Sequence, residues 1–298
     1  MACPLCASDS FTPGWLGTTL YRGKKFPYVA CGRCRSLYCQ PMPDADDLAS
    51  MYGTSYGSVG GPEGVVDPKE PGWVLDWLER VPKGSFVDYG CAGGELLLGA
   101  AARGWQALGV ELNREVVEET SRRTGLPVST PGDALARGAV AHVLHLGDVL
   151  EHLTDIDSEL PRILALLKPG GLLLAQGPLE ANANLFTWTL RIARVLKGRP
   201  PTEAPPYHVL LATVEGQWAL FERFGLTAVE KKVTEVSWPA PSRLAPADLR
   251  RPRNVGLFSI RLASRVLSRL SFGRWGNRYR YAGRFDPEHQ LLIPTAHQ

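Results

Sequence analysis

Four cysteines near the start of the chain are spaced to hold one metal ion. Cys3 and Cys6 form one Cys-x-x-Cys pair, and Cys31 and Cys34 form a second pair after 24 intervening residues. Two such turns complete a tetrahedral Zn²⁺ shell with S–Zn distances of about 2.3 Å. A disulfide or a redox-active pair is the alternative, but the chain looks cytosolic and nothing like a βαβ unit surrounds the pairs. The sequence therefore predicts a structural zinc ribbon over residues 1–40.

A second group of residues has the chemistry of a nucleotide site. The run Phe86-Val-Asp-Tyr-Gly-Cys-Ala-Gly-Gly94 follows a predicted strand and opens a predicted helix. Its small residues let the backbone approach a ligand, and the first helical N–H groups can donate to it. Glu111 ends the next predicted strand, 23 residues after Asp88, where a carboxylate can accept both ribose hydroxyls. A dinucleotide-binding enzyme would show G-x-G-x-x-G, whereas here an aspartate precedes the first glycine.

Alternating strand and helix patterns position these residues. Strand patterns at 85–88, 107–111, 143–146 and 172–176 alternate with helical patterns at 73–81, 95–103, 114–124 and 157–167. We expect a turn at 168–171, a further helix at 213–224 and two last strands at 227–236 and 277–285. This alternation is typical of an α/β fold with a mainly parallel sheet. The predicted organisation is a ribbon at 1–40, a linker or lid at 41–72 and a main domain at 73–298, with an insertion at about 177–212.

Composition narrows the class of protein. The 298 residues are 44% hydrophobic and 21% charged, which excludes wholesale disorder, and the net charge is only +3. That charge argues against a protein whose whole surface binds nucleic acid. No run approaches about 18 consecutive apolar residues, and the start lacks a signal-peptide pattern, so we expect no membrane span and a cytoplasmic location.

Several motifs together resemble the class I S-adenosylmethionine-dependent methyltransferases. These are the glycine loop with its preceding aspartate, the acidic end of the second strand, Asp148-Val-Leu-Glu-His-Leu153 and Leu166-Leu-Lys-Pro-Gly-Gly-Leu-Leu-Leu174. The resemblance spans roughly residues 73–236 and implies a Rossmann-like class I methyltransferase sheet with S-adenosylmethionine as the cofactor. The cysteine pairs, followed by Pro41-x-Pro43 and by Tyr52 and Tyr56, are similar to a subgroup with an N-terminal zinc ribbon. That subgroup includes methyltransferases that tailor sugars and other natural products.

The resemblance also implies a cofactor site, residue by residue. The methionine part would be held by Asp88 and by the turn that contains Gly90, Cys91, Ala92 and Gly94. Ala92 stands where the commonest pattern has glycine, which is an accepted variant. His142 replaces the usual aspartate of the fourth strand, and we expect little effect from it.

The rest of the implied cofactor site lies further along the chain. Glu111 would bind the ribose hydroxyls, and Leu112 would lie against the adenine. Asp133 would bind the adenine amino group, with a backbone N–H from Ala134. Two residues at the end of the fourth strand, Asp148 and Val149, would line the pocket.

Three residues are candidates for the catalytic step. His208 lies in the insertion after the fifth strand. Related sugar methyltransferases carry a histidine in the corresponding stretch, and the resemblance implies that His208 acts as a general base. A structural role for His208 is the alternative. His152 could share a metal with Asp148 and Glu151, as in some ubiquinone-pathway relatives, or simply shape the pocket floor. Tyr56, together with Tyr52, could close over the cofactor and orient a substrate hydroxyl, although packing of the linker explains both tyrosines nearly as well.

A basic segment occupies about residues 243–285. It contains eleven arginines and one aspartate, a local net charge of +10 that leaves −7 for the rest of the chain. Arg261, Arg265 and Arg269 share one helix face. A second, apolar face is formed by Phe258, Leu262, Val266 and Leu270. The segment could form a wall for a phosphorylated or acidic substrate, an RNA footprint, a surface for anionic membrane or a solvated basic face.

The sequence favours one function and leaves two alternatives. The first is methylation of a small molecule, at a hydroxyl oxygen of a sugar or natural-product-type metabolite. The second is a ribosomal or transfer RNA methyltransferase with a zinc module, which the modest net charge and the lack of a recognised RNA-binding domain disfavour. The third is a non-catalytic binding protein with a vestigial cofactor pocket, which the intact Asp88, Gly90 and Glu111 disfavour.

Overall fold

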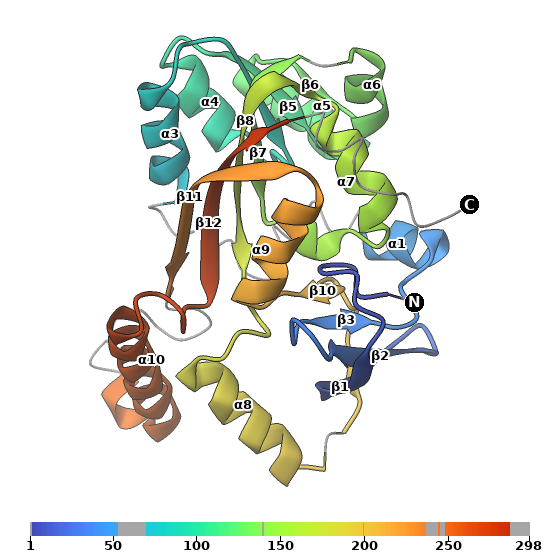
Figure 1. Ribbon diagram of the computed structural model, residues 1–298, viewed down its shortest axis with the longest axis vertical. Coiled ribbons are helices and arrows are strands. Elements are labelled where there is room, and N and C mark those ends of the chain that lie inside the picture. Colours follow the sequence, from blue (N-terminus) through green and yellow to red (C-terminus); the bar gives the residue numbers. More distant parts are fainter. Residues whose placement is uncertain are drawn as a thin grey trace. The chain divides into compact units, whose positions relative to one another are not determined.

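In the computed structural model (Figure 1), alternating strands and helices fold into two units. The structure describes residues 2–52, 70–138, 140–198, 200–236, 244 and 248–286. The first unit comprises Met1–Met42, Gly177–Leu220 and Lys231–Arg280. The second comprises Pro43–Gln176, Phe221–Glu230 and Tyr281–Gln298. The domain boundaries expected from the sequence remain a prediction.

A seven-stranded sheet organises the unit that contains the glycine loop. Its order is β11-β12-β8-β7-β4-β5-β6, and β4 lies parallel to both β5 and β7. The strand bounds are β4 Ser85–Tyr89, β5 Gln106–Val110, β6 Val128–Ser129, β7 Ala141–Gly147, β8 Leu167–Pro178, β11 Leu226–Thr234 and β12 Arg278–Phe285. The direction of strand addition reverses between β4 and β7, and at such a switch point ligands bind beyond the carboxyl ends of the strands. The predicted α/β, Rossmann-like fold is confirmed.

Helices connect these strands and bury an apolar core against the sheet. The described helical segments of this unit are α1 Ala45–Met51, α3 Glu70–Arg80, α4 Glu95–Ala101, α5 Arg114–Thr124, α6 Pro131–Ala136, the 3₁₀ turn η1 Leu150–His152 and α7 Ile156–Leu164. The expected helix at 114–124 matches α5, because Asn113 caps its first turn and Gly125 ends it in the left-handed conformation. Trp77 and Leu78 of α3 and Leu97 of α4 pack with Phe86 of β4 in this core.

The N-terminal cysteines belong to a five-stranded sheet in the other unit. Strands β1 Phe11–Tyr21, β2 Lys24–Cys31 and β3 Leu37–Cys39 form an antiparallel meander. Two strands from the insertion complete it, because β9 Thr202–Glu203 pairs with β1 and β10 Leu210–Leu211 pairs with β3. Sequence analysis expected only a helical insertion in this region, since strands of two residues carry no periodic signal.

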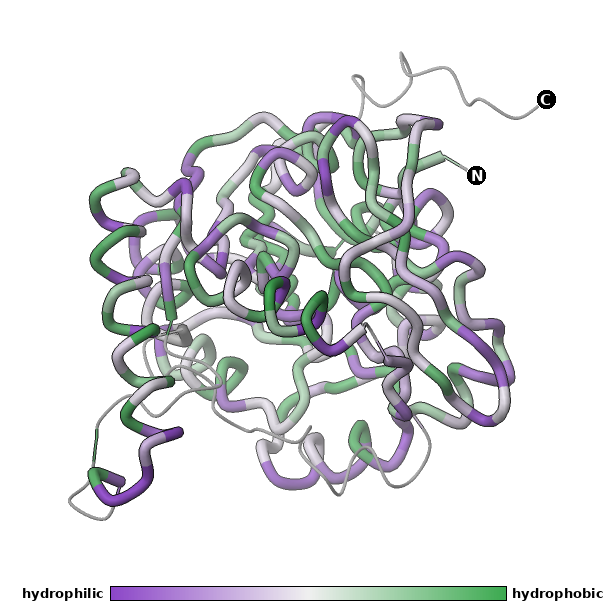
Figure 2. Tube along the Cα trace, turned by 90° about the horizontal axis from the view of Figure 1, so that it is seen from below, coloured by the Kyte–Doolittle hydropathy of each residue, from purple (hydrophilic) through white to green (hydrophobic). Residues whose placement is uncertain are grey.

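Further helices complete the first unit. They are α8 Leu185–Leu196, most of α9 Val214–Arg223, the 3₁₀ turn η2 Asp248–Arg250 and α10 Pro252–Leu270. The helices α8 and α10 pack against each other at the lower end of Figure 1. Figure 2, seen from below, shows hydrophobic and hydrophilic residues alternating along α10 at its left edge.

One expected turn lies inside a strand. Residues 168–171 belong to β8, where the pairing with β7 shifts register between Ala141 and Val143 and Gly170 adopts a positive φ of 70°. The prolyl and glycyl residues therefore produce a bulge in the strand rather than a break before it. In the part of the chain that the structure describes, no helix combines the length and apolar character needed to cross a membrane.

Candidate functional site

The glycine loop joins β4 to α4 through a backbone that only small residues adopt easily. Gly90 and Gly94 have φ values of 83° and 78°, and Ala92 also has a positive φ, of 42°. A Cβ atom at Gly90 would lie 2.8 Å from Cγ2 of Val149, so the turn and the end of the fourth parallel strand touch. The predicted residues Gly90 and Val149 are thereby brought together.

Glu111 bridges the second strand to this loop. Its carboxylate accepts hydrogen bonds from the backbone N–H groups of Ala92 at 3.1 Å and of Leu112 at 2.7 Å. The side chain of Leu112 is exposed, and Cys91 is buried. Burial raises the pKa of the Cys91 thiol, which therefore stays neutral at physiological pH. Seven of the predicted cofactor residues thus lie in or beside one loop: Gly90, Cys91, Ala92, Gly94, Glu111, Leu112 and Val149.

Asp88 is held by a histidine that sequence analysis did not select. The carboxylate Oδ1 lies 2.7 Å from Nδ1 of His145, and both side chains are about 95% buried. The two residues are direct register partners on the neighbouring strands β4 and β7. Because the carboxylate accepts the Nδ1 proton, the imidazole points its other nitrogen away from Asp88. Nothing in the sequence marks His145, since the register that pairs it with Asp88 appears only in the folded sheet.

The remaining predicted cofactor residues follow β6 and β7. Asp133 accepts a hydrogen bond from the Thr130 hydroxyl at 2.7 Å, and Ala134 is fully buried in α6. Asp133 and Thr130 also line an open cavity of about 380 Å³ bounded by α5, β6 and α6. Asp148 adopts a positive φ of 53° directly after β7, a strained conformation that is typical of functional sites.

One predicted catalytic residue in this unit has a defined partner. Nδ1 of His152 lies 2.9 Å from the Tyr52 hydroxyl, and the two rings meet edge to face. Tyr52 closes the C-terminus of α1, and His152 ends η1, so a segment before the glycine loop reaches the end of the fourth strand. Tyr56, the other tyrosine of the predicted pair, lies outside the described residues.

His208 forms a second histidine–carboxylate pair, in the other unit. Its Nδ1 lies 2.7 Å from Oε2 of Glu180, and both side chains are about one third exposed. The Tyr28 hydroxyl donates to the backbone carbonyl of His208 at 2.8 Å, which fixes the chain at this point. Sequence analysis missed Glu180 because 28 residues separate it from His208.

The four N-terminal cysteines converge as predicted. All four are buried, and their Sγ atoms lie within 4.8 Å of one another. Cys3 and Cys34 are 3.7 Å apart and Cys6 and Cys31 are 3.5 Å apart, far longer than a disulfide bond of about 2.05 Å. A hydrogen bond from Cys3 lowers the pKa of the Cys34 thiol to about 5. The cluster therefore consists of four cysteines without a disulfide whose sulfur atoms share one small volume.

Comparison with known proteins gives one family match and several similar solved structures. Residues 72–231 match the family model described as "Methyltransferase domain". No curated protein matches the chain. A solved S-adenosylmethionine-dependent methyltransferase from Archaeoglobus fulgidus is 16% identical, with 72% of this chain and 94% of that chain covered and a TM-score of 0.41.

Two other solved structures are similar at the same level. Phosphoethanolamine N-methyltransferase 2 from Haemonchus contortus, in complex with S-adenosyl-L-methionine, is 16% identical over 74% of this chain and 53% of that chain, with a TM-score of 0.47. A methyltransferase complex with the Haloferax volcanii Trm112 activator is 17% identical over 82% and 99%, with a TM-score of 0.49. At these scores the structural likenesses carry no weight for activity. The family model covers more than half of the chain, and the chain therefore belongs to the methyltransferase domain family.

Proposed function

We propose that this methyltransferase acts on a hydroxyl oxygen of a small molecule, a sugar or another natural-product-type metabolite. The observation that carries the proposal is the pair formed by His208 and Glu180, whose Nδ1 and Oε2 atoms are 2.7 Å apart. Because the carboxylate accepts the Nδ1 proton, the neutral imidazole keeps a lone pair on Nε2 and can accept a proton there. A hydroxyl must lose its proton when it is methylated, so a positioned base favours an oxygen acceptor.

The residues assigned to the cofactor are consistent with this role. S-adenosylmethionine supplies the methyl group on a sulfonium sulfur, which is itself the leaving group. Asp88 and the turn from Gly90 to Gly94 would hold its methionine part, and Glu111 would accept the ribose hydroxyls. The carboxylate of Glu111 is already oriented by the Ala92 N–H, which supports this assignment. Asp133 and Ala134 would meet the adenine.

His152 and Tyr52 are proposed to orient the acceptor rather than deprotonate it. The hydrogen bond between the phenol and Nδ1 fixes both rings beside the end of the fourth strand, next to Asp148 and Val149. Alignment of the acceptor with the methyl group is the main task of the protein in such a displacement. Tyr56, which lies outside the described residues, is proposed to orient a substrate hydroxyl with its phenol.

We also propose that Cys3, Cys6, Cys31 and Cys34 hold one structural Zn²⁺, as in the zinc-ribbon subgroup. A tetrahedron with S–Zn distances of about 2.3 Å has edges of about 3.8 Å, close to the 3.7 and 3.5 Å found between the two sulfur pairs. The backbone N–H groups of Arg33 and Cys34 both donate to Sγ of Cys31 at 3.4 Å, which orients this sulfur within the cluster. Four cysteines leave no open coordination position, so the ion would stabilise the fold and take no part in the reaction.

The substrate class can be tested directly. The protein is incubated with radiolabelled S-adenosylmethionine and an extract of its source cells, and metabolites, RNA and protein are then separated. Label in the metabolite fraction, in a compound whose methyl group is on oxygen, is the expected result. Label in RNA would replace the proposal with RNA methylation, which the basic segment would then serve. Cofactor binding without label in any fraction would favour the non-catalytic alternative.

The role of His208 is tested with matched variants. Replacement His208→Asn or Glu180→Gln should lower turnover of the identified substrate by about 10²–10⁴-fold while cofactor affinity stays the same. The control is Tyr28→Phe, which removes the hydrogen bond to the backbone of His208 and leaves its ring and Glu180 intact. This control should lower stability and keep most of the turnover. Normal turnover in His208→Asn would make the histidine structural only.

A further inference from the structure

The two helices α8 and α10 have an unusual charge composition. Neither Leu185–Leu196 nor Pro252–Leu270 contains an aspartate or a glutamate, while together they carry six arginines. Both helices belong to the first unit, and they pack against each other. A solvent-exposed helix normally mixes both signs of charge, so this composition points to an anionic partner.

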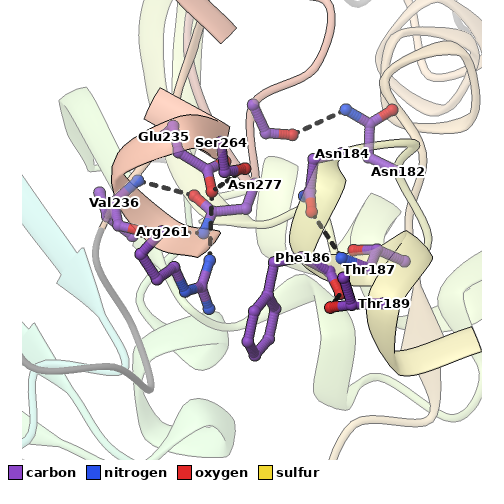
Figure 3. Close-up of polar contacts among 11 residues, drawn as sticks. Asn182, Asn184, Phe186, Thr187, Thr189, Glu235, Val236, Arg261, Ser264 and Asn277 are labelled. Atoms are coloured by element: carbon purple, nitrogen blue, oxygen red, sulfur yellow. Dashed lines mark hydrogen bonds and ion pairs between the residues drawn. The ribbon is translucent and has the colours of Figure 1, made fainter. Parts of the chain in front are cut away.

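The inward face of α10 is polar, which reverses the usual arrangement. Arg261 and Ser264 both bond to the buried carboxylate of Glu235, at 3.1 and 2.9 Å (Figure 3). The Arg261 guanidinium also lies 3.6 Å from the ring centroid of Phe186 in α8. Sequence analysis placed Arg261 on a basic stripe with Arg265 and Arg269, and the structure buries the first of these three residues.

The outward faces of both helices are instead apolar. Large hydrophobic side chains are exposed at Trp188, Ile192, Val195 and Leu196 of α8 and at Leu262, Val266 and Leu270 of α10, followed by Phe272 and Trp275. The exposed fractions reach 81% at Leu196, 71% at Leu270 and 98% at Phe272. Isolated exposed apolar residues are ordinary, but rows at helical spacing on two adjacent helices mark a binding surface.

We infer that the outward faces of α8 and α10 bind the surface of an anionic lipid bilayer. A helix that lies in the bilayer interface presents leucine and aromatic side chains to the acyl chains and arginines to the headgroups. Arg269 is exposed on α10 at helical spacing from Leu262 and Val266, and Arg253 is exposed in the first turn of the helix, so cationic groups are available to the headgroups beside the apolar row. The outward face of a helix is convex, and a bilayer accepts such a face without a shaped groove. This inference does not rest on the proposed function.

Two other partners fit the same surface less well. RNA would use the arginines and aromatic rings but would gain nothing from the aliphatic rows formed by Leu262, Val266 and Leu270. A second copy related by a twofold axis would place the same surface on both sides, so arginines would face arginines with no acidic residue from either helix to pair with them. An anionic bilayer has no such conflict.

Vesicle co-sedimentation of the full chain tests the inference. We expect binding to vesicles of phosphatidylglycerol mixed with phosphatidylcholine, and much weaker binding to phosphatidylcholine alone. The triple change Leu262→Ser, Val266→Ser and Leu270→Ser should reduce partitioning by about tenfold or more. The double change Arg253→Glu and Arg269→Glu should reduce it by roughly fivefold or more for each arginine, because each basic residue contributes at an anionic surface.

Matched controls come from the second unit. Leu98→Ser and Arg122→Glu change an exposed leucine and an exposed arginine on α4 and α5, and neither should alter vesicle binding. Circular dichroism of each variant confirms that the fold is intact. Failure to bind the anionic vesicles would overturn the inference, and so would equal vesicle binding by the α10 variants and the controls. If the protein binds no vesicles but binds RNA or self-associates, and the α10 variants abolish that binding, the surface belongs to that partner instead.

Discussion

At the scale of single residues, the buried pair of Asp88 and His145 is the most informative contact. We predict that His145→Leu weakens S-adenosylmethionine binding by about 10–100-fold, because the Asp88 carboxylate would lose a hydrogen bond from a buried donor. His145→Asn should retain most of the affinity, since its amide N–H can replace Nδ1–H. Isothermal titration calorimetry of the three proteins measures the difference.

The same strand provides a control for that prediction. His142, three residues earlier in β7, accepts a hydrogen bond from the backbone N–H of Ser85 at 3.0 Å, at the opposite end of the strand. His142→Leu should lower the melting temperature and leave cofactor affinity unchanged. If His145→Leu binds the cofactor as tightly as the unmodified protein, Asp88 does not depend on this histidine.

At the scale of elements, α10 is anchored by the buried ion pair of Arg261 and Glu235. Burial raises the pKa of Glu235 and lowers the pKa of Arg261, so desolvation outweighs the attraction between them. We predict that Arg261→Met destabilises the fold by about 3–5 kcal/mol, because it leaves an unpaired buried carboxylate. The double change Arg261→Met and Glu235→Leu should cost much less in urea unfolding. Equal costs for the single and double variants would show that packing, and not the charge, determines stability here.

Sequence patterns specified the elements with strong periodicity and missed those defined by long-range pairing. The glycine loop, α5 and the parallel strands follow from local signals such as the Asn113 cap and the apolar runs. By contrast, β9 and β10 exist only because residues 202–203 and 210–211 pair with the N-terminal meander. The orientation of α10 was equally hidden, since a pattern with arginines on one face and leucines on another does not say which face is buried. The partner of each histidine, Asp88 or Glu180, likewise depends on register and on the path of the chain.

At the scale of the whole molecule, the cysteine cluster belongs to a sheet whose strands come from the N-terminal segment and from the distant residues 202–211. Thr213, just before α9, donates through its hydroxyl to the carbonyl of Cys34 at 2.6 Å, and its N–H donates to Ser36. Strand β10 pairs with β3 directly beside this contact. Order at the cysteines is therefore linked to order in residues 202–217, and loss of the proposed zinc ion should disturb both segments.

Removal of zinc tests whether the ion stabilises the sheet, and it tests whether the second unit binds the cofactor without the ordered first unit. We expect one zinc per chain by elemental analysis, and we expect chelation or Cys34→Ser to lower the melting temperature sharply, because metal binding energy is folding energy in such clusters. Cys39→Ala is the matched control: this cysteine is buried in β3 but lies outside the cluster, so its loss should cost only a small-cavity penalty.

Cofactor affinity should survive zinc loss, since every residue assigned to the cofactor belongs to the second unit, which buries its own core. Substoichiometric zinc with an unchanged melting temperature would remove the zinc site, whereas loss of cofactor binding on chelation would show that the second unit needs the first in order to fold.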